Sequence, residues 1–352
     1  MLDQAEFIAR YDKENALGVI ADQPRQLHQE YEPGNLSHLA HARQVVVAGM
    51  GGSALAAEFV KSWLADRLPV PLVIVRDYTL PAFVGPDTLV VASSYSGNTE
   101  ETLAALAEAE TRGAKIAVMA AGGKLLEAAR AKGHAHIRTV PHGHPHFDLP
   151  AGLQPRLAVL YGVKALAVLL ESVGLVSEVQ AELSAAAAWV LAEVPAWAAE
   201  VPAADNPAKQ IAQQLAGHPV VVYGGPTLAL PAMKWKIDCN ENAKNLAFYN
   251  YFPEFNHNEF LGWAHPVEQP FKVVELRSHL DHPQVQKRFD ITNKLRAKQF
   301  VPIEIQAAGT TKLEQMLWTV ILGDFASAYL AFLNGIDPTP VELIERFKHE
   351  LA

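Results

Sequence analysis

The sequence is poor in cysteine and in charge, and it has no excess of basic residues. Cys239 is the single cysteine among 352 residues, so no intrachain disulfide can form, as is typical of a reducing cytoplasm. Charged residues make up 19% of the chain, which argues against long disordered arms. The net charge of −9 argues against nucleic acid and anionic membranes as partners, since both bind clustered Lys and Arg. An anionic small substrate remains compatible, because a local pocket can be positive on a negative surface.

The sequence also lacks the signals of export and of membrane insertion. Residues Met1 to Glu6 are acidic and have neither the basic start nor the apolar core of a signal peptide. No stretch of about 18 residues is free of charged and polar breaks, so we predict no membrane-spanning segment. We therefore expect a cytoplasmic protein.

What the chain does have is an alternation of short apolar runs and helical stretches, in two similar halves. We predict strands at 44–48, 70–75, 87–92 and 114–119, and again at 219–225, 271–277 and 301–306. We predict helices at 54–64, 100–112, 156–173, 176–193, 228–240 and 313–333, and a short amphipathic helix at 338–351. This pattern is typical of an α/β fold with parallel sheets covered by helices on both faces. The expected divisions are an N-terminal helical segment (1–40), a first α/β domain (41–150) and a second one (151–352).

A loop rich in hydroxyl groups follows the third predicted strand. Its sequence is Ser94-Tyr95-Ser96-Gly97-Asn98-Thr99, and a predicted helix begins directly after it. Open α/β sheets bind ligands at the carboxyl ends of their strands. A helix N-terminus there offers unpaired N–H groups that suit a phosphate, and Gly97 lets the backbone come close.

The same loop has a simpler interpretation as a helix cap without a ligand. Asn98 or Thr99 would cap the helix, and Glu101 or Thr102 would complete the arrangement. Both interpretations are compatible, because a capped helix can still bind an anion. The loop lacks the Gly-Lys-Ser/Thr ending of a nucleoside triphosphate loop, so it indicates phosphate as a handle and not as the group transferred.

A glycine turn, Gly49-Met50-Gly51-Gly52-Ser53, follows the first predicted strand. It is a weak match to the dinucleotide fingerprint, and no acidic residue clearly ends the next strand. A second glycine turn, Gly224-Gly225, follows the strand at 219–225 and resembles the first.

Two further segments, 238–244 and 252–259, are dense in titratable, amide and aromatic side chains. Such groups suit acid–base catalysis, in which a carboxylate moves a proton between carbons and a histidine acts on oxygens. The alternative is a polar turn with solvated Glu241, Glu254 and Glu259.

Four segments together resemble the bifunctional phosphoglucose/phosphomannose isomerases, which belong to the sugar-isomerase-domain superfamily. They are the glycine turn at 49–53, the serine loop at 94–99, Asn240-Glu241-Asn242-Ala243-Lys244 and Pro253-Glu254-Phe255-Asn256-His257-Asn258-Glu259. The resemblance runs from about residue 40 to the C-terminus, and the last two segments are the more specific. It implies two similar sugar-isomerase-type parallel-sheet subdomains. It also implies an aldose–ketose isomerase that interconverts glucose 6-phosphate and mannose 6-phosphate with fructose 6-phosphate through a cis-enediolate.

The resemblance further implies the residues that hold the substrate phosphate. These are Ser53, Ser94, Ser96 and Thr99, with the backbone at Gly51 and Gly52 approaching the substrate.

Four residues are implied to act in catalysis. Glu241 would shuttle the proton between C1 and C2, and His257, expected from the partner subunit of a homodimer, would assist ring opening. Arg156 would stabilise the enediolate, a role that suits a guanidinium because it keeps its proton. Lys348 would act in ring opening. The alternatives are a surface residue at a helix start for Arg156 and an ordinary solvated charge for Lys348.

One position departs from the family pattern. A threonine seven residues before the C-terminal lysine is linked with mannose 6-phosphate activity in this family. Val341 stands there in this sequence, and the nearest threonine is Thr339. Either the loop shifts by two residues or the second activity is weaker.

No metal or other cofactor is expected. His142, His144 and His146 alternate in a Gly/Pro-containing loop and match no standard metal-ligand spacing. We interpret this segment as a loop between domains.

A phosphosugar-binding regulator with the same fold is the alternative function. The joint presence of Glu241, His257, Arg156 and Lys348 argues against it, because a pure sensor has no need of them. An amidotransferase-linked isomerase is also disfavoured, because no N-terminal cysteine nucleophile or glutaminase domain is present.

Overall fold

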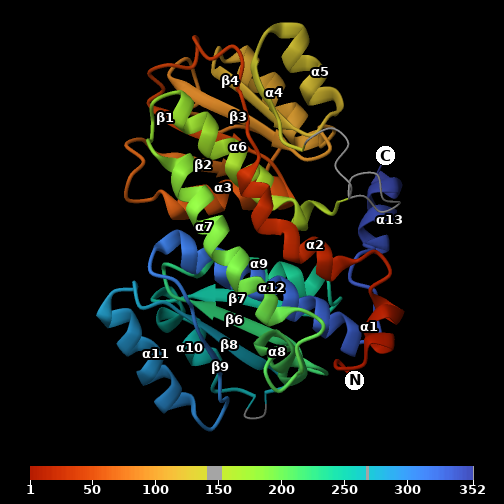
Figure 1. Ribbon diagram of the computed structural model, residues 1–352. Helices are drawn as coiled ribbons and strands as arrows, with labels where there is room; N and C mark the ends of the chain where they lie inside the picture. Colours follow the sequence, from red (N-terminus) through yellow and green to blue (C-terminus); the bar gives the residue numbers. More distant parts are fainter. Residues whose placement is uncertain (141–152, 267–268, 352) are drawn as a thin grey trace. The chain divides into compact units, whose positions relative to one another are not determined.

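Two parallel sheets, one in each half of the chain, organise the fold (Figure 1). The computed structural model describes residues 1–140, 153–266 and 269–351. Its packing divides the chain into two units. The first unit comprises residues 23–188, and the second comprises residues 1–22 and 189–352. The predicted α/β class is confirmed.

The first unit contains a five-stranded sheet in the order β2-β1-β3-β4-β5, with all neighbours parallel. Its strands are β1 (Gln44–Ala48), β2 (Leu72–Val75), β3 (Thr88–Ser94), β4 (Lys115–Ala120) and β5 (Ala135–Arg138). Its helices are η1 (Gln23–His28), α3 (Gly51–Trp63), α4 (Glu100–Thr111), α5 (Gly123–Lys132), η2 (Pro155–Leu157) and α6 (Val159–Ser172). Val46 and Val90 pack with Leu106 of α4 and Leu125 of α5 on one face. Helices α3 and α6 cover the other face.

The second unit contains a four-stranded parallel sheet in the order β7-β6-β8-β9. Its strands are β6 (Val220–Gly224), β7 (Ala247–Tyr251), β8 (Lys272–Arg277) and β9 (Ile303–Gln306). Its helices are α1 (Ala5–Tyr11), α2 (Ala16–Asp22), η3 (Val194–Trp197), α8 (Pro207–Leu215), α9 (Ala229–Glu241), η4 (Glu254–His257), α10 (Glu259–Gly262), α11 (Pro283–Arg296), α12 (Lys312–Leu333) and α13 (Glu342–Leu351). The division between the units falls within α7 (Val179–Glu193). Tyr223 packs with Phe252 and Phe289 on one face of the sheet, and α9 covers the other.

Helix α12 is the buried centre of the second unit, and α1, α2, α8 and α9 all pack against it. A capping box begins the helix: the Glu314 N–H donates to the Thr311 hydroxyl at 3.1 Å, and the Thr311 N–H donates to the Glu314 carboxylate at 2.9 Å. By length and composition α12 is able to span a membrane, but 89% of its most apolar window is buried inside the fold. That burial is typical of a core helix.

All of the predicted strands are present, but the sequence pattern misses β5 and β7. Strand β5 is only Ala-His-Ile-Arg, with two polar residues in four. Strand β7 lies at the sheet edge and exposes Phe248, Tyr249 and Tyr251. Neither strand has the continuous apolar run of a central parallel strand.

The two units divide at different residues from the predicted domains. Helix α6 packs on α3, so the chain stays with the first sheet well beyond residue 150. Residues 1–22 pack on α12 and belong to the second unit, and the N-terminal segment is helical only as far as His28. The packing of apolar helix faces sets these limits, and chain order does not.

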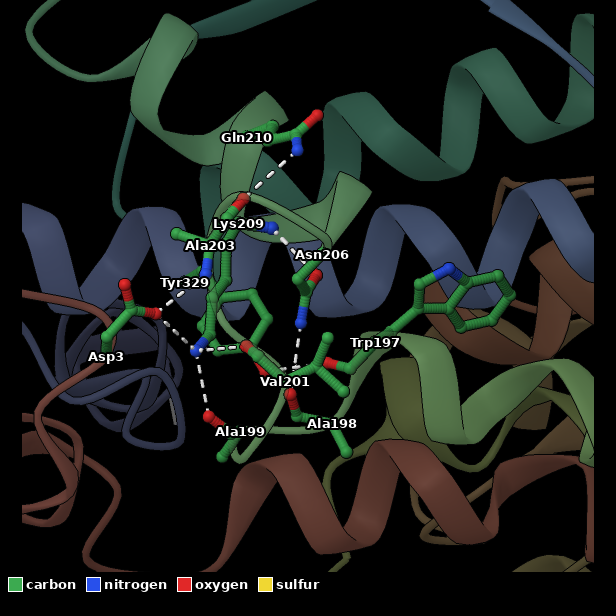
Figure 2. Close-up of polar contacts among 10 residues, drawn as sticks. All are labelled: Asp3, Trp197, Ala198, Ala199, Val201, Ala203, Asn206, Lys209, Gln210 and Tyr329. Atoms are coloured by element: carbon green, nitrogen blue, oxygen red, sulfur yellow. Dashed lines mark hydrogen bonds and ion pairs between the residues drawn. The ribbon is translucent and has the colours of Figure 1, made fainter.

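A buried lysine ties the N-terminal segment to the second unit (Figure 2). The Lys209 side chain is 0% exposed, and its Nζ donates to Asp3 Oδ1 at 3.1 Å. The same Nζ donates to the carbonyl oxygens of Ala199 and Val201, both at 2.8 Å. The Ala203 N–H donates to Asp3 as well, and this bond, followed by the one from Lys209, lowers the pKa of the Asp3 carboxyl.

We expect Lys209→Met to destabilise the second unit, because two carbonyl oxygens and the Asp3 carboxylate lose their donor. The free energy of unfolding, measured by urea denaturation, should fall by about 2–4 kcal/mol. Asp3→Asn is the matched control and should cost much less, because Asp3 is half exposed. A Lys209→Met protein as stable as the wild type would contradict the anchoring role.

Candidate functional site

The serine loop lies where β3 ends and α4 begins. The Tyr95 N–H donates to the Ser53 hydroxyl at 3.0 Å, and the Ser94 and Thr99 hydroxyls are 2.7 Å apart. The four residues predicted to hold phosphate, which include Ser96, therefore share this loop and the adjoining first turn of α3. The structure brings them together.

A glycine contact holds this loop against the next one. Gly97 has φ 72°, and a Cβ there would lie 1.8 Å from the carbonyl oxygen of Gly122, so only glycine fits. The Lys124 N–H also donates to the Asn98 side-chain oxygen at 3.1 Å. The start of α5 therefore braces the loop.

The interpretation of this loop as a helix cap is confirmed for the position of Thr99 but not for its side-chain hydrogen bond. Thr99 occupies the N-cap position of α4, but its side chain makes no capping hydrogen bond. Its hydroxyl pairs with Ser94, which is only 3% exposed, whereas Ser96 is exposed. The first N–H groups of α4 thus keep their capacity to bind an anion.

A small cavity lies behind the loop, lined by Ser53, Ser94, Tyr95 and Pro155 among others. Its volume is about 20 Å³, which is room for about one water molecule. Because phosphate is larger, it would bind on the outer side of the loop, where Ser96 is exposed.

Arg156 is buried beside the glycine turn. It lies in η2, is 2% exposed, and donates from Nη1 to Gln154 Oε1 at 3.2 Å. Gly51 and Gly52 begin α3, and a Cβ on Gly52 would lie 2.5 Å from the carbonyl oxygen of Pro155. The alternative interpretation of Arg156 as a surface residue is therefore wrong. A buried guanidinium retains its charge, which suits the predicted role in stabilising an anion.

The second unit has a matching glycine turn after β6, but a carboxylate of the protein itself fills it. The Thr227 N–H donates to Asp281 Oδ1 at 2.9 Å. A Cβ on Gly225 would lie 1.8 Å from Asp281 Oδ2, and Asp281 is 6% exposed. A negative group already occupies this turn, which disfavours the binding of a phosphate there.

Glu241 is the last residue of α9 and lines a cavity of about 700 Å³ in the second unit. Lys244, Leu246 and residues 340–344 line the same cavity. Cys239, two residues before Glu241, is 2% exposed, and burial raises the pKa of its thiol to about 12. Cys239 is therefore a packing residue and not a nucleophile.

Buried polar contacts anchor α9 to α12. Lys234 Nζ donates to the carboxylates of Asp238 and Asp324, and all three side chains are at most 2% exposed. Burial, followed by the neighbouring Asp324, raises the pKa of Asp238 well above its ordinary value. Asn242 Nδ2 donates to Ser327 Oγ at 2.9 Å. These contacts fix the helix end that carries Glu241.

The interpretation of 252–259 as a solvated turn is wrong for Glu259. The Tyr223 hydroxyl donates to Glu259 Oε1, and Asn250 Nδ2 donates to Oε2 at 2.6 Å. Trp263 Nε1 donates to the Tyr223 hydroxyl at 2.8 Å. Burial, followed by the Glu259 charge, raises the pKa of Tyr223. Glu259 is thus a structural acceptor, whereas Glu254 is exposed.

His257 is exposed. It lies between Asn256 and Asn258, whose side-chain amides are both hydrogen-bonded. Asn256 Nδ2 donates to Thr292 Oγ1 at 3.0 Å, and Asn258 Nδ2 donates to Glu254 Oε1 at 2.8 Å. The neighbours therefore hold the backbone, and the imidazole is presented at the surface of the second unit.

Lys348 and Val341 lie in the C-terminal segment. Lys348 Nζ donates to Glu345 Oε1 at 2.8 Å, and its side chain is 63% exposed, as in an ordinary solvated ion pair. Val341 lines the Glu241 cavity, whereas Thr339 is 7% exposed and is not part of that lining. The valine stands on the cavity wall, and no shift of two residues brings the threonine there.

The predicted residues fall into separate groups. The phosphate loop and Arg156 lie in the first unit, whereas Glu241, His257 and Lys348 lie in the second. Glu241 lines the large cavity, and neither His257 nor Lys348 does.

The predicted histidine loop, with His142, His144 and His146, lies outside the described residues. Across residues 1–140, 153–266 and 269–351, no group of three or more His, Cys, Asp or Glu side chains is arranged to hold a metal ion.

Sequence reasoning missed the residues that support these groups. The spacing of Lys234 and Asp238, four apart on one helix, is a signal that indicates a pair. Nothing local indicates Asp324 or Tyr223, because their partners Lys234 and Glu259 are 90 and 36 residues away in the sequence.

Comparison with known proteins gives consistent matches along the chain. Residues 38–151 match the SIS domain model, and residues 204–351 match the model of the bacterial phospho-glucose isomerase C-terminal SIS domain. A bifunctional phosphoglucose/phosphomannose isomerase of Caldicellulosiruptor bescii is 37% identical over 338 residues, which is 94% of this chain and 96% of that protein. One of Aquifex aeolicus is 36% identical over 87% of this chain and 90% of its own length.

A solved structure shares the fold. It is the C-terminal domain of glucosamine-fructose-6-phosphate aminotransferase from Francisella tularensis, with a TM-score of 0.69 and 12% identity. The match covers 95% of this chain and 98% of that one.

We expect Thr99→Val to weaken the binding of inorganic phosphate at least about fivefold, because a hydroxyl beside the helix start is lost. Thr111→Val, at the other end of the same helix, is the matched control and should bind as the wild type does. Isothermal titration calorimetry measures both. Equal affinities in the two variants would remove Thr99 from the phosphate site.

Proposed function

The chain belongs to the family of bifunctional phosphoglucose/phosphomannose isomerases, and we propose on that basis that it interconverts glucose 6-phosphate and mannose 6-phosphate with fructose 6-phosphate. The observation that carries the chemistry is the position of Glu241. Its carboxylate ends α9, lines a cavity of about 700 Å³, and stands on a helix anchored by buried contacts. The cavity leaves free space beside the Glu241 carboxylate, as a base that takes a proton from a sugar carbon requires.

The proposed reaction is a proton transfer between adjacent carbons. The Glu241 carboxylate removes the proton from C2 of the open-chain aldose and returns it to C1, and the cis-enediolate lies between these steps. The hydroxyl proton of O2 passes to O1 in the same interval, so that C1 becomes the alcohol and C2 the ketone. Arg156 stabilises the negative charge that develops on the enediolate oxygen. His257 and Lys348 act earlier, on the oxygens of the closed ring. The serine loop holds the phosphate and does not react.

We propose a homodimer in which His257 reaches the active site of the partner subunit. Its imidazole is exposed on the second unit. The edge strand β7 exposes Phe248, Tyr249 and Tyr251, between 39% and 49% each. Exposed aromatic side chains of this kind are typical of subunit interfaces. We also propose that the protein acts in the cytoplasm and needs no metal or redox cofactor.

The purified enzyme should turn over both sugars with or without chelator. It should turn over glucose 6-phosphate faster than mannose 6-phosphate, because Val341 replaces the family threonine.

Glu241→Gln should lower kcat about 10³-fold or more, because the amide accepts no proton, while phosphosugar binding survives. Glu304→Gln, an exposed carboxylate on β9, is the matched control. A coupled assay that detects glucose 6-phosphate formed from fructose 6-phosphate measures kcat for both variants and the wild type. Binding without turnover in the wild type would point to a regulator, and an active Glu241→Gln enzyme would remove Glu241 from the mechanism.

Mixing two inactive variants tests the shared site. Subunits with Glu241→Gln and subunits with His257→Ala should be inactive alone. After unfolding and refolding together, hybrid dimers contain one site with both native residues, so the mixture should regain about a quarter of the wild-type activity by random pairing. A mixture that stays inactive while it forms dimers would place His257 and Glu241 in the same subunit's site.

A further inference from the structure

The turn between α9 and β7 is tied to the segment that follows α12. Lys244 Nζ donates to the carbonyl oxygens of Asp337 at 2.9 Å and Pro338 at 3.1 Å. Asn334 Nδ2 donates to the carbonyl oxygen of Ala243 at 3.1 Å. The hydrogen-bonded residues are 91 to 94 residues apart in the sequence.

The backbone of Lys244 is in an uncommon conformation. Its φ is 49°, a left-handed value that residues other than Gly and Asn rarely adopt. Lys244 Nζ also donates to the carbonyl oxygen of Asn242 at 3.3 Å. A glycine would fit this turn with less strain, but it would make none of the contacts of the Lys244 ammonium to residues 337 and 338.

Both ends of this link line one cavity. Glu241 lies three residues before Lys244, and Pro340 and Val341 lie two and three residues after Pro338, whose carbonyl group the ammonium binds. Lys244 therefore links the helix end that carries Glu241 to the segment that also lines this cavity at 340 and 341. A change in this link would change the width of the cavity.

We propose that Lys244 is a positioning residue that sets the distance between Glu241 and the wall at 340–341, and that it thereby influences the choice between the two aldoses. The inference rests on the proposed function. Glucose 6-phosphate and mannose 6-phosphate differ only at C2, the carbon from which Glu241 removes the proton. Both converge on one enediolate, because C2 loses its stereochemistry there. The distance between Glu241 and the wall at 340–341 determines how readily each epimer presents its C2 proton to the Glu241 carboxylate.

The test replaces the ammonium and keeps the length and shape of the stem. Lys244→Met has this property, and it leaves the backbone strain as it is. Lys244→Arg retains a cation and should restore part of the effect, and Lys287→Met, an exposed lysine on α11, is the matched control. Hydrogen exchange of residues 334–344 reports the link directly, and kcat and KM are measured with both aldoses.

We expect exchange of residues 334–344 to rise at least about tenfold in Lys244→Met, because the charged donor is lost. The ratio of kcat/KM for mannose 6-phosphate to that for glucose 6-phosphate should change at least about threefold. Lys244→Arg should lie between Lys244→Met and the wild type, and Lys287→Met should match the wild type.

Two results would overturn the proposal. Unchanged exchange of 334–344 would show that Lys244 does not hold the loop. Faster exchange with an unchanged ratio of the two sugars would reduce Lys244 to a purely structural contact. A wild-type enzyme inactive on both sugars would contradict the proposed function instead, and the exchange measurement would still decide whether the link exists.

Discussion

The burial of one apolar helix is the constraint on which the second unit depends. Helix α12 is 22 residues long and packs against α1, α2, α8 and α9. The apolar contacts are not directional, so they do not fix which turn of α9 meets which turn of α12. The polar contacts do: Lys234 pairs with Asp324, and the Trp235 indole N–H donates to the Thr319 carbonyl at 2.7 Å. The position of Glu241 follows from that register, because it ends the same helix.

The first unit is organised by close backbone approach and not by side-chain charge. At Gly97 and Gly52, neighbouring loops pack directly against the backbone at the carboxyl edge of the sheet. A side chain at either position would collide with a carbonyl oxygen of the neighbouring loop. The start of α4 and the exposed Ser96 lie beside these contacts, an arrangement that suits an anion without requiring a lysine. The second unit repeats the strand and glycine turn but places Asp281 in it. The two similar halves thus differ at this turn: the carbonyl oxygen of Pro155 packs on Gly52 in the first unit, whereas Asp281 fills the turn in the second.

Most polar residues around the candidate catalytic groups form hydrogen bonds that hold the backbone in place. Glu259, Asn256 and Asn258 hold the backbone around His257. Asp238 and Asn242 hold the helix end around Glu241. This arrangement is what preorganised catalysis requires, because a reacting group is effective only when its support is rigid. It also explains why these segments contain so many amides and carboxylates, because most of them hold the backbone in place.

The sequence by itself determined the α/β class, the central strands and the position of the serine loop, because these depend on local apolar runs and on glycine and hydroxyl residues at strand ends. It also indicated the family, through segments short enough to recognise. It did not determine β5 and β7, the limits of the two units, the buried state of Arg156, or the role of Glu259. Strands β5 and β7 lack a continuous apolar run. The other features depend on partners far along the chain: α6 packs on α3, Pro155 on Gly52, and Tyr223 donates to Glu259. Only the tertiary structure decided them, because burial and hydrogen bonding between distant residues leave no periodic signal in the sequence.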